Sequence, residues 1–217
     1  MQQWLEAFTA AAEAAFPGRI VCLGIQGSYG RGEATGQSDI DLVAILDSFS
    51  YHDLKTYDHL LSKLAHREKI CGFVSGRREL EQWDRAELFQ FCHDTIPLVG
   101  DLEWLRPLIS PADIRRAVHT GACGLYHGCV HNALHERDPE LLGALLKSAA
   151  FVLQAKCYCE TGLYFKKRAQ LLEKLTGRDR MVLELLLSPE KREDLDQVSR
   201  LLMEWASQTI DRCAPEN

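Results

Sequence analysis

Two aspartates separated by one residue, Asp39 and Asp41, carry the clearest chemical signal in the sequence. They open the run DIDLVAIL, residues 39–46, which predicts a β-strand, so both carboxylates are expected to leave the same face. Neighbouring carboxylates repel each other and stay ionised together when a cation lies between them or water separates them. Hard oxygen ligands at this spacing suit Mg²⁺, which keeps waters and substrate phosphates in its other positions. The pair therefore indicates a magnesium site that also receives phosphates.

A glycine-rich segment, GSYGRGEATGQS at residues 27–38, lies directly before this pair. It follows an apolar run at residues 20–25 that predicts a buried strand. Backbone N–H groups in such a segment can hold phosphate oxygens, and Ser28 can add a hydroxyl donor. The spacing G-x-x-G-x-G differs from the dinucleotide-binding fingerprint, and the G-K-[ST] of a P-loop is missing. We therefore expect residues 27–32 to hold a nucleoside triphosphate beside the two aspartates.

Together, Gly27-Ser28, the glycine-bearing turn and Ser38-Asp39-Ile40-Asp41-Leu42 resemble the signature of the polymerase-β-like nucleotidyltransferase superfamily. The resemblance covers residues 20–46. It implies that Asp39 and Asp41 are the catalytic residues that bind Mg²⁺. It also implies that loop residues hold the β- and γ-phosphates and that a lysine of a helical domain reaches the triphosphate. The nucleotide-binding residues expected on this basis are Gly27, Ser28, Arg31, Ser38 and Lys147.

The resemblance also implies a reaction. A hydroxyl of the acceptor attacks the α-phosphorus of the nucleotide, and pyrophosphate leaves. We expect transfer of a nucleoside monophosphate, AMP from ATP, to a small molecule of the antibiotic type. Two alternatives stay open: the acceptor is a protein, as in adenylyltransferases of the antitoxin type, or the chain is a regulatory module that binds nucleotide without turnover.

One position departs from the superfamily pattern. Members usually supply a third carboxylate from the next strand, which here is the predicted strand KICGFV at residues 69–74 and contains no acid. Cys71 or Gly72 occupies the expected position. The nearest acids in the sequence are Glu68, Glu79 and Asp94. If the protein is an enzyme, we expect an acid from outside this strand to approach the aspartate pair, with Glu79 and Asp94 as the first candidates.

The surrounding pattern predicts an α/β nucleotidyltransferase domain at residues 1–108, built on a small mixed sheet with helices, and an all-helical bundle domain at residues 109–217. The bundle is similar in layout to the C-terminal domains of antibiotic nucleotidyltransferases, and the substrates are expected between the two halves. Helices are predicted at 4–16, 51–67, 77–83, 112–136, 139–161 and 166–175, with a stop at Gly177 and a last segment capped by Ser188-Pro189. Residues 88–99 are ambiguous because Pro97 interrupts any helix there.

The composition limits the classes of partner that the protein is expected to bind. The chain has 217 residues, 46% of them hydrophobic, and a net charge of −6, which disfavours binding to duplex nucleic acid or an anionic membrane. Eight cysteines without a CxxC pair predict reduced thiols. The start of the chain lacks a secretion-signal pattern, and no uninterrupted apolar run reaches about 18 residues. We therefore expect a cytoplasmic protein, and an oligomer is compatible with the sequence.

Overall fold

The computed structural model describes residues 1–214, which form two compact units. One unit comprises residues 1–84 and 91–108, and the other comprises residues 85–90 together with the chain from residue 109 onward. The predicted fold class is confirmed: a small mixed sheet with helices is followed by a helical region. The expected domain boundary at residue 108 stays a prediction.

A sheet of four strands forms the centre of the first unit, in the order β3-β2-β1-β4. Strand β2 is parallel to β3, and β1 is antiparallel to both β2 and β4. The strands are β1 (Ile20–Ile25), β2 (Ile40–Leu46), β3 (Ile70–Gly76) and β4 (Ile96–Gly100). The ambiguous segment thus becomes a helix followed by β4, and Pro97 is tolerated because β4 is an edge strand.

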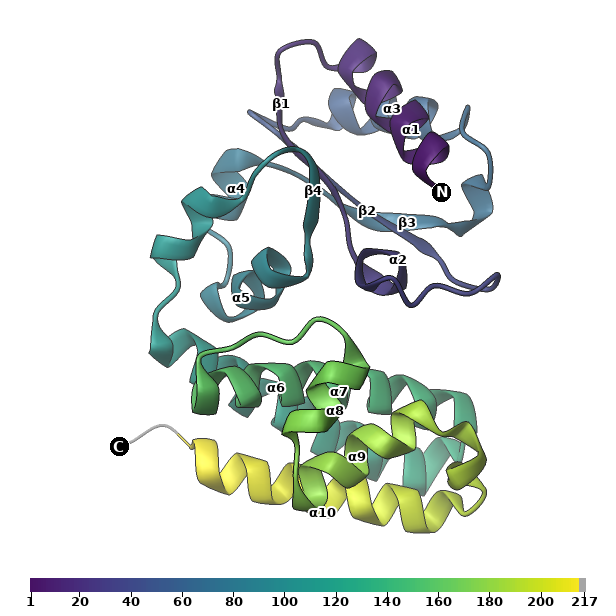
Figure 1. Ribbon diagram of the computed structural model, residues 1–217, viewed down its shortest axis with the longest axis vertical. Coiled ribbons are helices and arrows are strands. Elements are labelled where there is room, and N and C mark those ends of the chain that lie inside the picture. Colours follow the sequence, from purple (N-terminus) through teal and green to yellow (C-terminus); the bar gives the residue numbers. More distant parts are fainter. Residues whose placement is uncertain (215–217) are drawn as a thin grey trace. The chain divides into compact units, whose positions relative to one another are not determined.

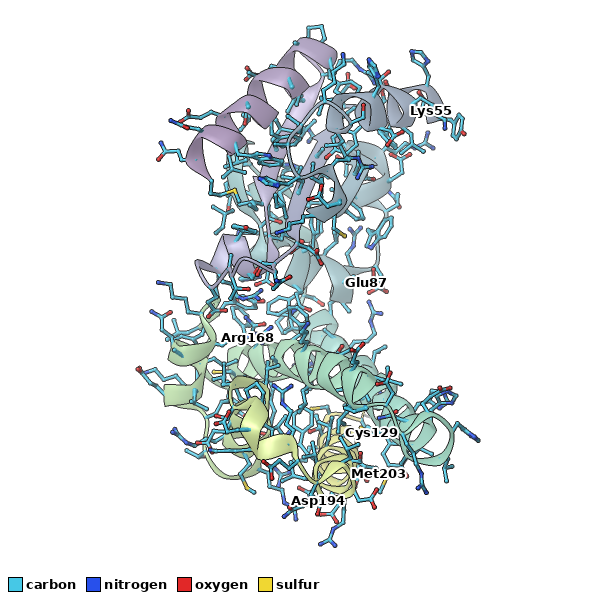
Figure 2. All side chains as sticks on the ribbon, turned by 90° about the vertical axis from the view of Figure 1, so that its right-hand side faces the viewer. Lys55, Glu87, Cys129, Arg168, Asp194 and Met203 are labelled. Atoms are coloured by element: carbon cyan, nitrogen blue, oxygen red, sulfur yellow. The ribbon has the colours of Figure 1, made fainter. Side chains whose placement is uncertain are left out.

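Helices α1 (Gln2–Ala15) and α3 (Tyr51–Leu61) lie side by side over one face of the sheet (Figure 1). Ile40, Leu42, Ala44 and Leu46 of β2 are buried in the same core as residues of these helices. Because side chains alternate along a strand, Asp41 and Val43 face the opposite side. Helix α3 ends at Leu61, earlier than predicted, and a 3₁₀ turn (Arg67–Lys69) leads into β3. Lys55 of α3 points away from the sheet (Figure 2).

The remaining helices of this unit are short. They are α2 (Gly27–Arg31), α4 (Arg77–Glu81), α5 (Arg85–Asp94), whose last turn belongs here, and a 3₁₀ helix (Glu103–Leu108). Phe73 of β3 makes edge contacts with the rings of Trp83 and Phe91, at centroid distances of 5.4 and 5.0 Å. The end of α5 therefore packs on the face of the sheet opposite α1 and α3.

The second unit is helical, and several of its helix ends are set by capping residues that lie next to them in the sequence. Ser110 caps α6 through a capping box, and Asp138 and Gly162 bound α7. Two expectations were wrong: Gly177 begins α9 instead of ending a helix, and Asp194, whose side chain accepts from the Gln197 N–H, caps the last helix in place of Ser188. The elements are α6 (Pro111–His131), a π turn (Asn132–Glu136), α7 (Pro139–Thr161), α8 (Arg168–Lys174), α9 (Gly177–Leu187), a 3₁₀ helix (Pro189–Arg192) and α10 (Leu195–Cys213).

Helix α7 lies at the centre of this unit and packs against α6 and α9. It is the one helix among the described residues that is long and apolar enough to cross a membrane by length and composition, but half of its apolar window is buried inside the unit. Lys156 of α7 donates to both carboxylate oxygens of Asp179 at 2.8 and 2.6 Å, and Trp205 donates to the same carboxylate at 2.7 Å. Figure 2 marks Cys129 and Met203, which lie on the neighbouring helices α6 and α10. These contacts are typical of a core helix.

Candidate nucleotide and metal site

Asp39 and Asp41 lie at the start of β2, in the first unit. Asp39 is the exposed residue directly before the strand, and Asp41 is its half-buried second residue. Burial raises the pKa of the Asp41 carboxyl, and the negative charge of Asp39 raises this pKa further. The structure therefore places the two carboxylates close enough to repel each other.

The backbone at Gly27 packs directly against the carboxylate of Asp41. Gly27 has a φ of +63°, and a Cβ at this position would lie 1.8 Å from Oδ2 of Asp41. The N–H of Gln26 donates to the backbone carbonyl of Asp41 at 2.8 Å. Only glycine combines this left-handed backbone with so close an approach. The glycine segment and the aspartate pair thus form one structural feature.

The predicted phosphate loop is a single short helical turn, α2. It begins after Gln26 and ends at Gly32, whose φ is +72°. The N–H of Gly30 donates to the Gln26 carbonyl at 3.0 Å, and the N–H of Glu33 donates to the Ser28 carbonyl at 2.8 Å. Ser28 lies one residue beyond the contact between Gly27 and Asp41. The turn holds the backbone of residues 27–30 in a fixed shape beside the carboxylates.

Arg31 provides a positive charge near the aspartates. Its Nε donates to the carboxylate of Glu33 at 2.9 Å, and its side chain is only 13% exposed. The charge of Arg31 opposes the rise in the pKa of Asp41, so the guanidinium lies within electrostatic reach of that carboxylate. The structure thus brings Arg31 together with Asp39, Asp41 and Gly27.

Ser38 has a structural contact in the segment before Asp39. Its hydroxyl accepts from the backbone N–H of Thr35 at 2.9 Å and closes a turn there. The Nζ of Lys69 donates to the carbonyl of Gly36 at 2.6 Å and ties the same segment to the start of β3. Ser38 therefore helps to position Asp39, and a direct contact of Ser38 with nucleotide stays a prediction.

Lys147 belongs to the second unit, where it is exposed on α7. Its contact with nucleotide stays a prediction. Lys156, on the same helix, forms the ion pair with Asp179 described above.

The register between β2 and β3 shows which residue takes the place of the third carboxylate. Asp41 lies opposite Cys71, and Leu42 lies opposite Gly72. Cys71 therefore shares a face with Asp41, while a Cβ at Gly72 would lie 1.9 Å from the carbonyl oxygen of Leu42. Among residues 1–214, no three His, Cys, Asp or Glu side chains are grouped so that they could hold a metal ion together. Two carboxylates, not three, mark the start of β2.

Residues 13–90 match the family model described as a nucleotidyltransferase domain. The resemblance to nucleotidyltransferases is confirmed. The matched stretch contains the Gly27–Asp41 contact and Cys71, and it supports nucleotidyl transfer as the general class of activity.

One solved structure shares the fold of the chain. Spectinomycin adenyltransferase AAD(9) from Enterococcus faecialis, in a crystal structure with ATP and spectinomycin, is 11% identical to the chain with a TM-score of 0.61. The alignment covers 97% of this chain and 99% of that one. A nucleotidyltransferase-like protein from Exiguobacterium sibiricum is 12% identical over 97% of this chain and 75% of its own, with a TM-score of 0.36. No curated protein matches the sequence at a significant level.

Proposed function

We propose that the protein transfers AMP from ATP to a hydroxyl group of a small antibiotic-like molecule, with Mg²⁺, in the cytoplasm. The observation that carries the proposal is the close packing of the Gly27 backbone against the Asp41 carboxylate, with Asp39 alongside, inside the stretch that matches the nucleotidyltransferase domain. In this proposal the turn at Gly27 would bind phosphate, next to two carboxylates that would act as hard oxygen ligands.

The residues present fit a divalent cation. Burial and the charge of Asp39 both raise the pKa of Asp41, so the site favours anything that neutralises this pair. Asp39 and Asp41 would hold Mg²⁺, whose oxygen preference matches two carboxylates and a triphosphate. When bound, the ion would supply charge neutralisation for the triphosphate and for the oxygens that gain charge during transfer.

The residues of the chain itself would bind and orient the nucleotide. Backbone N–H groups of the turn that starts at Gly27, together with the Ser28 hydroxyl, would donate to the β- and γ-phosphates. Arg31 would add a positive charge held in place by Glu33. The acceptor oxygen would then form a bond to the α-phosphorus while the bond between that phosphorus and the pyrophosphate oxygen breaks. A small-molecule acceptor is supported by the fold shared with an adenyltransferase crystallised with ATP and spectinomycin.

A second function has one specific observation in its favour. Cys71 stands opposite Asp41, where the superfamily usually has a carboxylate that assists turnover. A chain without this acid could bind nucleotide and regulate a partner without transferring anything. Binding with no release of pyrophosphate would identify this alternative.

Pyrophosphate release tests the proposal. Purified protein is incubated with ATP, Mg²⁺ and a panel of hydroxylated aminocyclitols and aminoglycosides, and Asp41→Asn is compared with Glu13→Gln, which removes an exposed charge from α1. We expect acceptor-dependent release that falls at least about 100-fold in Asp41→Asn, because a ligand to the ion is lost, and is unchanged in Glu13→Gln. Calorimetry with Mg²⁺-ATP gives the second measurement. Binding and turnover that both survive in Asp41→Asn would show that the site is assigned wrongly.

A further inference from the structure

The proposed reaction needs a group that takes the proton of the acceptor hydroxyl. A carboxylate within hydrogen-bond reach of that hydroxyl would do so as a general base. Strand β3 cannot supply it, because Cys71 stands opposite Asp41 and Gly72 has no space for a side chain. The group must therefore come from another element.

Glu79 lies at the wrong end of the sheet. It follows β3, whose last residue, Gly76, pairs with Leu46, five residues along β2 from Asp41. At about 3.3 Å per residue, this is a separation of roughly 17 Å. The Glu79 carboxylate lies against Gly76, since a Cβ there would be 2.3 Å from its Oε2. Glu79 is thus held far from the aspartate pair.

Asp94 lies at the end of the sheet where the aspartate pair is found. It is the last residue of α5, and the next residue, Thr95, is buried beside β1. The side-chain amide of Gln26 donates to the Thr95 hydroxyl at 2.7 Å and to the carbonyl of Phe91 at 3.3 Å. The backbone N–H of the same Gln26 donates to the carbonyl of Asp41 at 2.8 Å. One residue, Gln26, therefore links the end of α5 to the strand that carries Asp41.

Helical spacing places Asp94 on the appropriate face. Phe91 precedes Asp94 by three residues, so the two side chains lie on one side of α5, one turn apart. The ring of Phe91 contacts Phe73, which shares its face of β3 with Cys71. The helix then continues toward Thr95 and Gln26, and Asp94 lies one turn beyond Phe91 in that direction.

We propose that Asp94 is the general base of the transfer reaction, acting from α5 in place of an acid on β3. This inference rests on the proposed function. The acceptor O–H proton moves to the Asp94 carboxylate as the acceptor oxygen bonds to the α-phosphorus and the bond to pyrophosphate breaks. A general base has to reach the acceptor hydroxyl but does not have to bind the ion. This agrees with the described residues, in which Asp39 and Asp41 are not joined by a third side chain that could bind a metal.

The test compares three substitutions that each neutralise one acid: Asp94→Asn, Glu79→Gln and Glu68→Gln. Glu68 serves as a second control because it lies in the 3₁₀ turn before β3, with a side chain that is 71% exposed. We expect Asp94→Asn to lower kcat about 100- to 10,000-fold and to leave the Kd for Mg²⁺-ATP, measured by calorimetry, within about threefold of the parent. Both controls keep the parental kcat.

Two further measurements separate a base from a structural role. At saturating Mg²⁺-ATP, which keeps Asp39 and Asp41 ionised, the parental rate should fall tenfold per pH unit on the acid side of its profile as the base is protonated. This limb should be missing from the residual rate of Asp94→Asn. Adding Cys71→Asp to Asp94→Asn should restore part of kcat, because position 71 shares a face with Asp41. Restored turnover also shows that the variant folds.

Three results would overturn the proposal. A kcat for Asp94→Asn within about threefold of the parent would show that another group takes the proton, and a loss confined to Glu68→Gln would identify that group as Glu68. A loss of Mg²⁺-ATP affinity equal to the loss in kcat would make Asp94 part of the binding site instead. Parental protein that binds Mg²⁺-ATP but releases no pyrophosphate would overturn the proposed function along with the base.

Discussion

The Asp41 carboxylate and the Asp47 carboxylate stand at opposite ends of β2 and experience opposite electrostatic environments. Burial and the neighbouring Asp39 raise the pKa of Asp41. The backbone N–H of Ser48 and the guanidinium of Arg19 outweigh burial and lower the pKa of Asp47. The two aspartates therefore affect folding stability with opposite signs as pH changes.

Without metal, Asp41→Asn should raise the melting temperature at pH 7. Because the folded-state pKa of Asp41 is raised, its contribution to stability is present at low pH and is lost as pH rises through that pKa. Removing the charge should therefore stabilise the folded protein at neutral pH. The gain should disappear below about pH 3.9, the ordinary aspartate pKa. Thermal unfolding in EDTA across this pH range measures it.

Asp47→Asn is the matched control, because its effect on stability at pH 7 should have the opposite sign. Its lowered pKa gives stability that is present above the unfolded-state pKa and is lost as pH falls through the folded-state value. This variant should melt below the parent at pH 7 and approach it in acid. An unchanged or lower melting temperature for Asp41→Asn at pH 7 would contradict the proposal that the Asp39 and Asp41 charges destabilise the protein when Mg²⁺ is absent.

At the scale of helices and strands, the elements that were predicted correctly are those whose ends are set by residues next to them in the sequence. The bounds of β1 were predicted correctly because an apolar run ends at Gly27, and those of α7 because Asp138-Pro139 and Gly162 are helix-boundary residues. The proximity of the glycine turn to Asp41 was also predictable, since both lie within a short stretch of sequence.

Other features depend on contacts between distant segments. The segment that contains β4 was left ambiguous because Pro97 argues against an unbroken helix. A strand accepts this proline because β4 lies at the edge of the sheet. The choice between Cys71 and Gly72 required the register with β2. The place of Asp94 at the same end of the sheet depends on the Gln26 side chain, which bridges segments more than 60 residues apart. Periodicity along the chain carries no information about such pairings.

Gly72→Ala should strongly destabilise the sheet. Gly72 has a φ of +135°, and a Cβ there would meet the backbone of Leu42, which cannot move without breaking the pairing of β2 with β3. Gly18→Ala is the control, since Gly18 has a φ of +72° but nothing within 4 Å of its Cβ position. We expect a loss of about 1 kcal/mol for Gly18→Ala from backbone strain alone.

Denaturant unfolding measures the difference between the two alanine variants. Gly72→Ala should lose at least about 3 kcal/mol or fail to fold, because a steric clash with backbone adds to the strain. Equal losses for the two variants would indicate that β3 shifts to accept the methyl group.

At the scale of the whole molecule, α5 is the element that both compact units use. Phe89 belongs to the second unit and is buried in its core, where its ring contacts Tyr158 and Tyr164 at 5.0 and 5.7 Å. Phe91, two residues later, belongs to the first unit and contacts Phe73. A domain boundary at residue 108 would place both phenylalanines with the sheet. The two compact units each contain one of them.

Phe89→Ala and Phe91→Ala, made in the full chain, should therefore destabilise different units. Phe89→Ala removes a fully buried ring, which costs about 3–5 kcal/mol, and amide hydrogen exchange should accelerate in α6 and α7 while β1 and β2 stay protected. Phe91→Ala should accelerate exchange in β3, with a smaller effect because its ring is only half-buried. If α5 instead belonged wholly to the nucleotidyltransferase domain, both variants would expose the sheet and leave the helical unit protected. Exchange measured by mass spectrometry on the same peptides of both variants distinguishes these outcomes. Mg²⁺-ATP should restore protection in Phe91→Ala, whose loss lies in the unit that carries Asp41, and should leave the exchange of α6 and α7 in Phe89→Ala unchanged.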